Sequence, residues 1–156
     1  MNIFVLDKNP ILAAQMQCDK HVVKMVLESA QMLSTVRTGL GLDAPYKPTH
    51  KNHPCTKWVL QNKVHYFWLY EHFKALCSEY TDRYNKIHKC SQYLELFNIS
   101  NPTESQDYFE SLGYALAMPE EYKTTCPVES YRAYYKGDKA YMAKWDKLNN
   151  TPKWWN

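Results

Sequence analysis

A chain of 156 residues is long enough to bury one hydrophobic core, so we expect residues 1–156 to form a single domain. The net charge of +3 permits a polyanionic partner, but it falls well short of the charge of a dedicated nucleic-acid-binding tail. The five cysteines, without a signal peptide or an 18-residue apolar run, favour a reduced cytoplasmic protein over a secreted disulfide framework or a membrane protein.

The aromatic content of 15% exceeds what a small core needs. Two interpretations remain open: some rings lie at the surface and stack on ligands or bases, or the core is rich in tyrosine with hydrated hydroxyls.

The first half of the chain predicts several helices. Residues 1–6 are an apolar run that fits a strand or a buried terminal segment. Asn9-Pro10 and Asp19 are helix starts, and Gly39 and Gly41 end the second helix. That helix has an apolar face at helical spacing, made of Val22, Val23, Val26, Leu27, Ala30 and Leu33.

The rest of the chain predicts further helices joined by irregular segments. Residues 42–54 hold three prolines and two histidines, which is typical of a functional loop. Residues 55–88 fit one long helix or two in series, and a short helix follows around residues 91–97. Residues 98–127 are mixed, and a last helical region spans residues 128–148 with an interruption near Gly137. The predicted fold is mainly α, a compact single domain with long irregular loops.

A polar stripe lies on the helix that starts at Asp19. His21, Lys24, Glu28 and Gln31 are spaced three or four residues apart and therefore share one face. One interpretation is a solvated outer face, in which an exposed Glu28 contributes little to stability. The other places Glu28 as a general acid/base beside His21, since a carboxylate and an imidazole together offer two protonation states near neutral pH.

Cysteine and histidine side chains also permit a zinc-site hypothesis. Cys18, His21, His50, His53 and Cys55 supply enough donors for a tetrahedral zinc. Their spacing is irregular, however, and we expect neither a bound metal nor another cofactor.

The C-terminus carries two adjacent rings, Trp154 and Trp155, after Pro152. The rings either dock on the core or stack on a base. Four nearby lysines fit phosphate contacts or a solvated face equally well: Lys139, Lys144, Lys147 and Lys153.

Three short motifs occur in a distinctive order along the chain. Residues 19–21 read Asp-Lys-His, with Glu28 seven residues beyond His21. Residues 51–54 read Lys-Asn-His-Pro, and residues 152–155 read Pro-Lys-Trp-Trp. In this order the motifs resemble the pyrimidine-dimer DNA glycosylase family, the endonuclease V type of T-even phages and its cellular relatives. They are similar to the surroundings of that family's catalytic glutamate, a loop of its cellular members and its C-terminal Pro-Thr-Trp-Tyr.

The resemblance implies an endonuclease V-like helical protein that displaces a base from DNA and attacks the sugar C1′ with its N-terminal α-amine. It gives Glu28 the role of the assisting glutamate, makes Met1 the conditional nucleophile and lets His21 and His53 line the cleft. An α-amine has an ordinary pKa near 8, so at pH 7 more of it is neutral than of a lysine side chain. Displacing the base exposes a carbon that stacking would hide.

The chain departs from the phage pattern at three positions. Asn2 stands where the phage enzyme has its nucleophilic threonine, while Leu27 and Gln31 stand where it has arginines. We therefore expect weaker phosphate binding. The predicted substrate-binding residues are Lys24, Gln31, His50, Asn52, Trp154 and Trp155.

The sequence thus favours a DNA glycosylase with AP-lyase-like activity on a damaged or modified base, in the host cytoplasm if the protein is viral. The alternatives are a non-catalytic nucleotide- or protein-binding module on the same fold and a zinc-dependent hydrolase.

Overall fold

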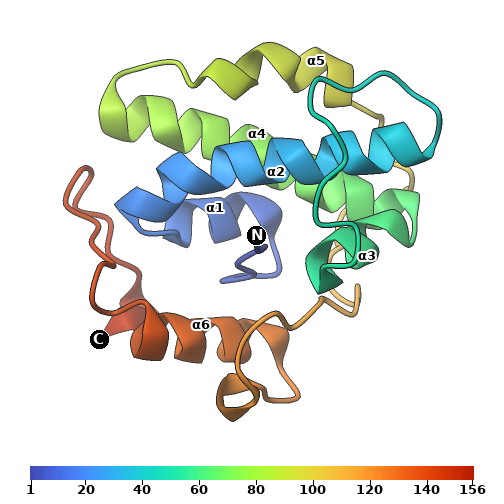
Figure 1. The fold of residues 1–156 in the computed structure, drawn as a ribbon. Helices are drawn as coiled ribbons and strands as arrows, with labels where there is room; N and C mark the ends of the chain where they lie inside the picture. The colour runs from blue at the N-terminus through green and yellow to red at the C-terminus, as the bar shows by residue number, and fades with distance from the viewer.

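The computed structural model describes residues 1–156 and contains helices but no strand (Figure 1). This confirms the predicted mainly α fold. The α-helices are α1 (Pro10–Met16), α2 (Asp19–Gly39), α3 (Pro54–Leu60), α4 (Lys63–Tyr84), α5 (Leu94–Phe97) and α6 (Pro127–Asp138). Three short 3-10 helices are η1 (Lys89–Tyr93), η2 (Glu120–Tyr122) and η3 (Lys153–Trp155).

The first two helices begin where the sequence predicts, and the second also ends at the predicted Gly39. The Asn9 side chain accepts hydrogen bonds from the amides of Ile11 and Leu12, which caps α1. Helix α2 begins at Asp19, and Gly41 follows its end with a φ of 74°, a left-handed conformation that glycine adopts without steric cost.

Residues 55–88 form two helices in series rather than one. The His53 ring caps α3 by accepting from the Cys55 amide, and the Asn62 side chain caps α4 by accepting from the His65 amide. Each cap starts a new helix, because it satisfies amides that have no partner within the helix.

Helices α1, α2 and α3 all pack against α4, and α6 runs across the opposite side of the N-terminal segment (Figure 1). Residues 3–6 are buried in this layer, so the apolar start is a buried terminal segment and not a strand. The Phe4 ring stacks on His21 of α2 at 4.4 Å and meets the Tyr135 ring of α6 edge-on at 5.4 Å. The first residues are therefore held between two helices distant in sequence.

The last helical region is shorter than predicted. Helix α6 continues through Gly137 and ends at Asp138, and two turns follow at residues 139–142 and 146–149. A residue far away in the sequence stabilises this segment, because the Asp19 carboxylate accepts hydrogen bonds from the amides of Asp146 and Lys147. The spacing of apolar residues along the sequence cannot reveal a side-chain contact of this kind.

The predicted apolar face of α2 is partly wrong. Val22, Val26 and Ala30 are buried, but Val23 and Leu27 are each 39% exposed. The N-terminal segment covers the stripe of His21 and Glu28 instead, and this turns the buried side of α2 toward those polar residues. No helix in the chain is long and apolar enough to cross a membrane.

Candidate active site

The N-terminal amine and Glu28 form the centre of the site. The α-amino nitrogen of Met1 lies 2.8 Å from Oε1 of Glu28. Glu28 is 8% exposed, so the interpretation of a solvated carboxylate is wrong. Two residues 27 positions apart thus form a largely desolvated ion pair.

The Met1 amine and the Glu28 carboxylate each keep atoms that are available for a reaction. The Met1 side chain is 2% exposed whereas the residue as a whole is only partly buried, so the exposed atoms of Met1 belong to its main chain. The second carboxylate oxygen of Glu28, Oε2, is buried and has no hydrogen-bond partner. A buried carboxylate oxygen without a partner costs free energy, and such a group is typical of a site that receives a ligand or a proton.

Asn2 anchors the N-terminal segment beside this pair. Its Nδ2 donates to the carbonyl of Ala117 at 2.9 Å, and its Oδ1 accepts from the amide of Ile3 at 2.8 Å. The Cys55 thiol and the Tyr131 hydroxyl lie 3.5 and 3.3 Å from the same Oδ1. One short side chain therefore joins the segment to α3, α6 and the loop before η2.

His53 lies within reach of both charges. Burial lowers its pKa first, the Met1 ammonium and His50 lower it further, and the Glu28 carboxylate opposes them. Because Nδ1 accepts from the Cys55 amide, the neutral ring carries its proton on Nε2. The Lys-Asn-His-Pro motif thus caps a helix and also brings a neutral imidazole to the pair.

His21 packs against the N-terminal segment at Phe4. Its ring stacks on Phe4, and its Nδ1 lies 2.6 Å from the Tyr135 hydroxyl. Burial, followed by the charges of Lys139 and Lys24, lowers its pKa to about 3. The expectation that this imidazole changes protonation near neutral pH is therefore wrong, since His21 stays neutral there.

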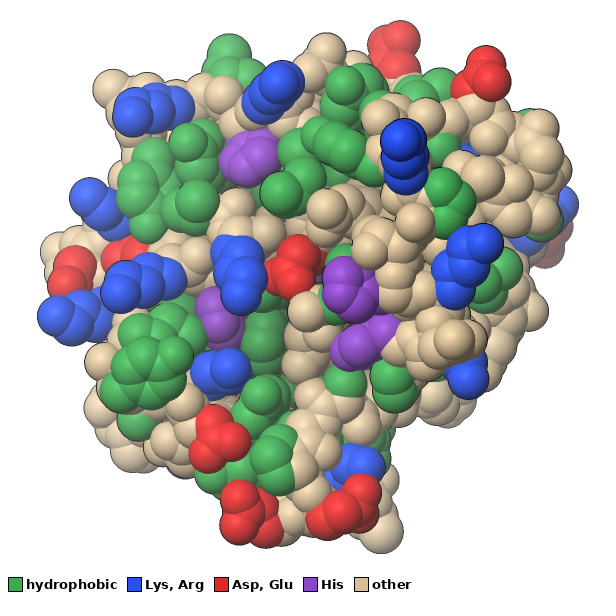
Figure 2. Space-filling view, viewed as in Figure 1, with side chains coloured by type: hydrophobic (Ala, Val, Ile, Leu, Met, Phe, Trp, Pro, Cys, Tyr) green, Lys and Arg blue, Asp and Glu red, His purple; other side chains and the backbone are tan.

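Two lysines flank this part of the site. Lys24 of α2 is exposed, and Lys139 follows α6 with its Nζ 5.1 Å from the Tyr134 ring centre. Both affect the pKa of His21, so both lie close to it. Figure 2 shows that lysine or arginine side chains and histidines gather across the middle of this face, around a hollow. Lys24 of α2 and Lys139, directly after α6, therefore bring two cations to the site even though positions 27 and 31 are uncharged.

The remaining predicted binding residues lie nearby on α2 and the 42–53 segment. Gln31 is half-buried one turn beyond Glu28, and His50 and Asn52 are exposed. His50 has a left-handed φ of 49° and its Nδ1 lies 2.8 Å from the Thr49 hydroxyl. Their role in substrate binding stays a prediction.

The C-terminal rings dock on the protein. Trp154 and Trp155 are half-buried, and Trp155 lies 4.9 Å from the buried Trp145 ring. Trp154 donates from Nε1 to the Met16 sulfur, and the Arg132 guanidinium lies 5.3 Å from its ring centre. This packing agrees with docking on the core, and a stacking role for these rings stays a prediction.

The five residues of the zinc hypothesis do not form one cluster. Cys18 contacts Tyr135 and Met142, whereas Cys55 points to Asn2. No three His, Cys, Asp or Glu residues lie close enough to hold a metal ion. The structure therefore gives the zinc-dependent hydrolase no ligand set.

An apolar pocket of about 420 Å³ opens elsewhere, between the C-terminal end of α2 and the start of α4. Leu40, Val59 and Tyr66 line it with Arg37 and Lys63 at its edge. None of the predicted site residues lines this pocket, so it is separate from the Met1–Glu28 pair.

Sequence reasoning missed the residues that position the site. In the sequence, Asn2 is notable only as a departure from the phage pattern. No sequence signal indicates that Phe4, Tyr131 and Tyr135 lie next to the site. Their importance arises from contacts that span more than 100 residues, which spacing along one helix cannot reveal.

A family model described as pyrimidine dimer DNA glycosylase matches residues 1–92, which is more than half of the chain. The matched segment includes Met1, Glu28 and His53 but ends before α6. No curated protein and no solved structure matches the chain.

Proposed function

The chain belongs to the pyrimidine dimer DNA glycosylase family, and on that premise we propose that it removes a damaged pyrimidine from DNA and cleaves the resulting abasic site. The nucleophile is the Met1 α-amine, and Glu28 is the catalytic carboxylate. The pyrimidine dimer that the family description names is the first candidate substrate.

The observation that carries this proposal is the 2.8 Å distance between the α-amine and Oε1 of Glu28. At this distance the carboxylate can accept a proton from the ammonium, which frees the nitrogen's electron pair. Because the pair is largely shielded from water, the charges interact more strongly than they would on an open surface.

The first chemical step replaces the base by the amine. The nitrogen gives its electron pair to C1′ while the bond between C1′ and the base breaks, and the base leaves with that bond's electrons and takes up the proton that Glu28 received from the ammonium. The attached nitrogen then loses a second proton, which the ionised Glu28 accepts. Glu28 then protonates O4′ as the sugar ring opens and the nitrogen forms a Schiff base with C1′.

The second step cleaves the DNA strand. A proton leaves C2′, its electron pair forms the C2′–C3′ double bond, and the 3′ phosphate departs with the electrons of its bond. Glu28, ionised again once it has protonated O4′, is the group suited to accept this proton, because the neutral His53 carries a proton on Nε2 and its Nδ1 already accepts from the Cys55 amide. Hydrolysis of the Schiff base then restores the amine.

The cations around the site supply the affinity for DNA. Lys24 and Lys139 both lie close to His21, which supports a role for them in binding the phosphates beside a displaced nucleotide. Phosphate contacts of this kind orient the duplex without reading its sequence.

Borohydride trapping tests the proposal. The protein is incubated with duplexes that carry either a central abasic site or a central pyrimidine dimer, reduced with borohydride, and digested for peptide mapping by mass spectrometry. We expect a covalent adduct with both duplexes, attached to the Met1 nitrogen. An undamaged duplex of the same sequence is the control.

Binding without any adduct would show a non-catalytic module and overturn the proposal. An adduct that maps to Lys24 or Lys139 would preserve the lyase chemistry but remove Met1 as the nucleophile.

A further inference from the structure

Tyr141 stands out from the chain's other rings. Its side chain is 83% exposed, the highest value among the exposed large hydrophobic residues, and no other aromatic residue belongs to that group. Its ring meets no other ring, and its hydroxyl makes no hydrogen bond within the protein. Most of the remaining aromatic side chains contribute to the core or pack against it, whereas the Tyr141 ring does neither.

The turn that carries Tyr141 is firmly held. The amides of Met142 and Ala143 donate to the Lys139 carbonyl at 3.1 and 2.9 Å, and Ala143 and Trp145 are buried. The Lys144 carbonyl accepts from the Asp19 amide at 2.8 Å, at the start of α2.

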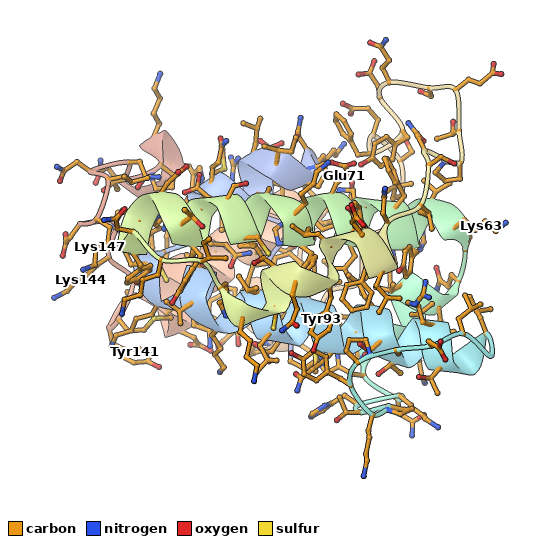
Figure 3. The ribbon with its side chains drawn as sticks, turned by 90° about the horizontal axis from the view of Figure 1, so that it is seen from above. Lys63, Glu71, Tyr93, Tyr141, Lys144 and Lys147 are labelled. Carbon is orange, nitrogen blue, oxygen red and sulfur yellow. The ribbon has the colours of Figure 1, made fainter.

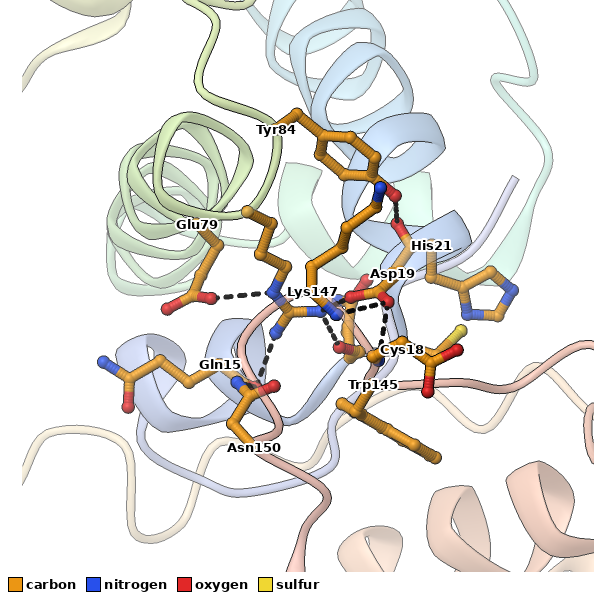
Figure 4. A network of polar contacts seen from close by, with 12 residues as sticks. Gln15, Cys18, Asp19, His21, Glu79, Tyr84, Trp145, Lys147 and Asn150 are labelled. Atoms are coloured by element: carbon orange, nitrogen blue, oxygen red, sulfur yellow. Dashed lines mark hydrogen bonds and ion pairs between the residues drawn. The ribbon is translucent and has the colours of Figure 1, made fainter.

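The Asp19 carboxylate also holds the segment that carries Tyr141. Its Oδ2 accepts from the Asp146 and Lys147 amides, and Figure 4 shows these bonds within one polar network that includes Trp145. An exposed ring on an anchored backbone is preorganised for a partner, because little backbone entropy is lost on binding.

The surroundings of the ring are cationic. Residues 139–150 contain three lysines and one acidic residue, Asp146. In Figure 3, Tyr141 lies near Lys144 and Lys147, at one end of the molecule. In that view, Tyr141 and the 42–53 segment lie along the same edge of the molecule. Because Figure 3 is turned by 90°, this edge corresponds to the face that Figures 1 and 2 show.

The Tyr141 turn is also connected to the active site. Lys139, two residues before Tyr141, lies close enough to His21 to lower its pKa, and His21 stacks on Phe4 of the N-terminal segment. The turn therefore adjoins the start of α2, and Glu28 lies further along the same helix.

We propose that Tyr141 stacks on a nucleobase that the bound DNA leaves without a paired neighbour, while Lys139 and Lys144 hold the adjacent phosphates. This inference rests on the proposed function. A ring flanked by lysines fits a nucleic acid, since every base offers a π-face and every nucleotide a phosphate. A protein partner would require a continuous apolar patch, whereas the residues next to this ring are mainly lysines and alanines.

The test measures binding to a duplex that the protein cannot cleave. The duplex carries a central tetrahydrofuran abasic analogue opposite 2-aminopurine, and affinity is followed by fluorescence anisotropy at several salt concentrations. We expect Tyr141→Ala to weaken binding by about 5- to 150-fold with an unchanged salt slope, because the loss is one of stacking. The matched control Tyr141→Phe keeps the ring and should bind within about twofold of the parent.

Two further readouts separate stacking from charge. The parent and Tyr141→Phe should quench 2-aminopurine emission on binding, and Tyr141→Ala should lose that quenching. Lys139→Met should instead flatten the salt slope by about one unit, because one phosphate contact is lost. Circular dichroism should give equal melting curves for all Tyr141 variants, since the ring is exposed.

The failures are distinguishable. If the parent binds neither damaged nor undamaged duplex and forms no borohydride adduct, the proposed function itself fails. If the parent binds and forms the adduct, while Tyr141→Ala binds and quenches as the parent does, only the stacking role of Tyr141 is refuted.

Discussion

The α-amine of Met1 lies 2.8 Å from Oε1 of Glu28, and the second oxygen of that carboxylate is buried with no partner. The pair joins the beginning of the chain to the middle of α2. It couples stability and chemistry, because the group that would activate the amine also holds the N-terminal segment in place.

Glu28→Gln should affect both properties. The amide oxygen still accepts a hydrogen bond from the amine, but the opposite charge is lost, so the free energy of unfolding should fall by about 1–3 kcal/mol. Borohydride trapping should slow by about 100-fold or more, because glutamine cannot take up the proton of the amine. Urea unfolding and the single-turnover trapping rate measure the two effects.

Glu129→Gln is the matched control, since Glu129 is an exposed carboxylate without an ion pair on α6. It should leave both quantities unchanged. A Glu28→Gln protein that traps DNA at the parent's rate would show that the carboxylate only stabilises the N-terminus.

Asn2→Ala should act mainly on the reaction rate. The substitution removes the bond to Ala117 and the acceptor of the Ile3 amide, so the amine loses its fixed direction toward Glu28. Trapping should slow by about 10- to 100-fold, as small displacements of a reacting group commonly cause. Asn9→Ala is a suitable comparison, because it removes a helix cap worth about 1 kcal/mol far from the chemistry. Equal trapping rates for the two variants would contradict a positioning role for Asn2.

The sequence predicted the helices well where the signal is local. Asn9-Pro10 and Asp19 mark helix starts because capping and proline geometry act within one turn. The end of α6 was placed about ten residues too late, because residues 139–150 are shaped by Asp19 and not by their own periodicity. The prediction failed where distant residues decide the local conformation.

The candidate site was predicted only in part. The polar stripe on α2 already predicts Glu28 as a catalytic candidate, and the resemblance adds Met1 and His53. The Met1 amine lies beside Glu28, and both of these charges act on the pKa of His53. The burial of Glu28 was not foreseen, because a polar stripe at helical spacing is usually a solvated face. In this protein the first six residues cover Glu28. The spacing of residues within α2 cannot reveal that a segment from another part of the chain packs on that face.

Stability should decline with acid through two buried histidines. Burial lowers the pKa of His21 to about 3 and that of His72 to about 4, both below the ordinary 6.5. As the pH falls below 6.5, the unfolded chain binds protons that the folded protein cannot, so the free energy of unfolding decreases until about pH 3–4. The slope contributed by each histidine approaches about 1.4 kcal/mol per pH unit.

His72→Gln isolates one of these contributions. Urea unfolding of the parent and the variant between pH 7 and 4.5 should show a slope smaller by up to one proton equivalent in the variant. The same slope in both proteins would mean that His72 is protonated in the folded state, contrary to its complete burial.

The final prediction concerns Arg83, whose fully buried side chain pairs with Asp19, the residue that holds the Tyr141 turn. Figure 4 shows the polar network around Asp19 and Glu79. The Arg83 guanidinium binds the carboxylates of Asp19 and Glu79 at 3.2 and 2.9 Å and donates to the Gln17 and Gln15 carbonyls at 2.6 and 2.8 Å. Arg83→Met would leave two largely buried carboxylates without their cation, and it should lower the free energy of unfolding by about 3–5 kcal/mol.

Lys74→Met provides the comparison, because it removes the cation from a more exposed pair with Glu71 and should cost at most about 1 kcal/mol. The milder Arg83→Lys keeps the charge but lacks the planar guanidinium that reaches four partners. We therefore expect a folded protein in which the Asp19 carboxylate is held less firmly. Hydrogen exchange should then quicken at the amides of Asp146 and Lys147, which bind Asp19. Unchanged exchange at these two amides in Arg83→Lys would show that Asp19 holds the turn without help from Arg83.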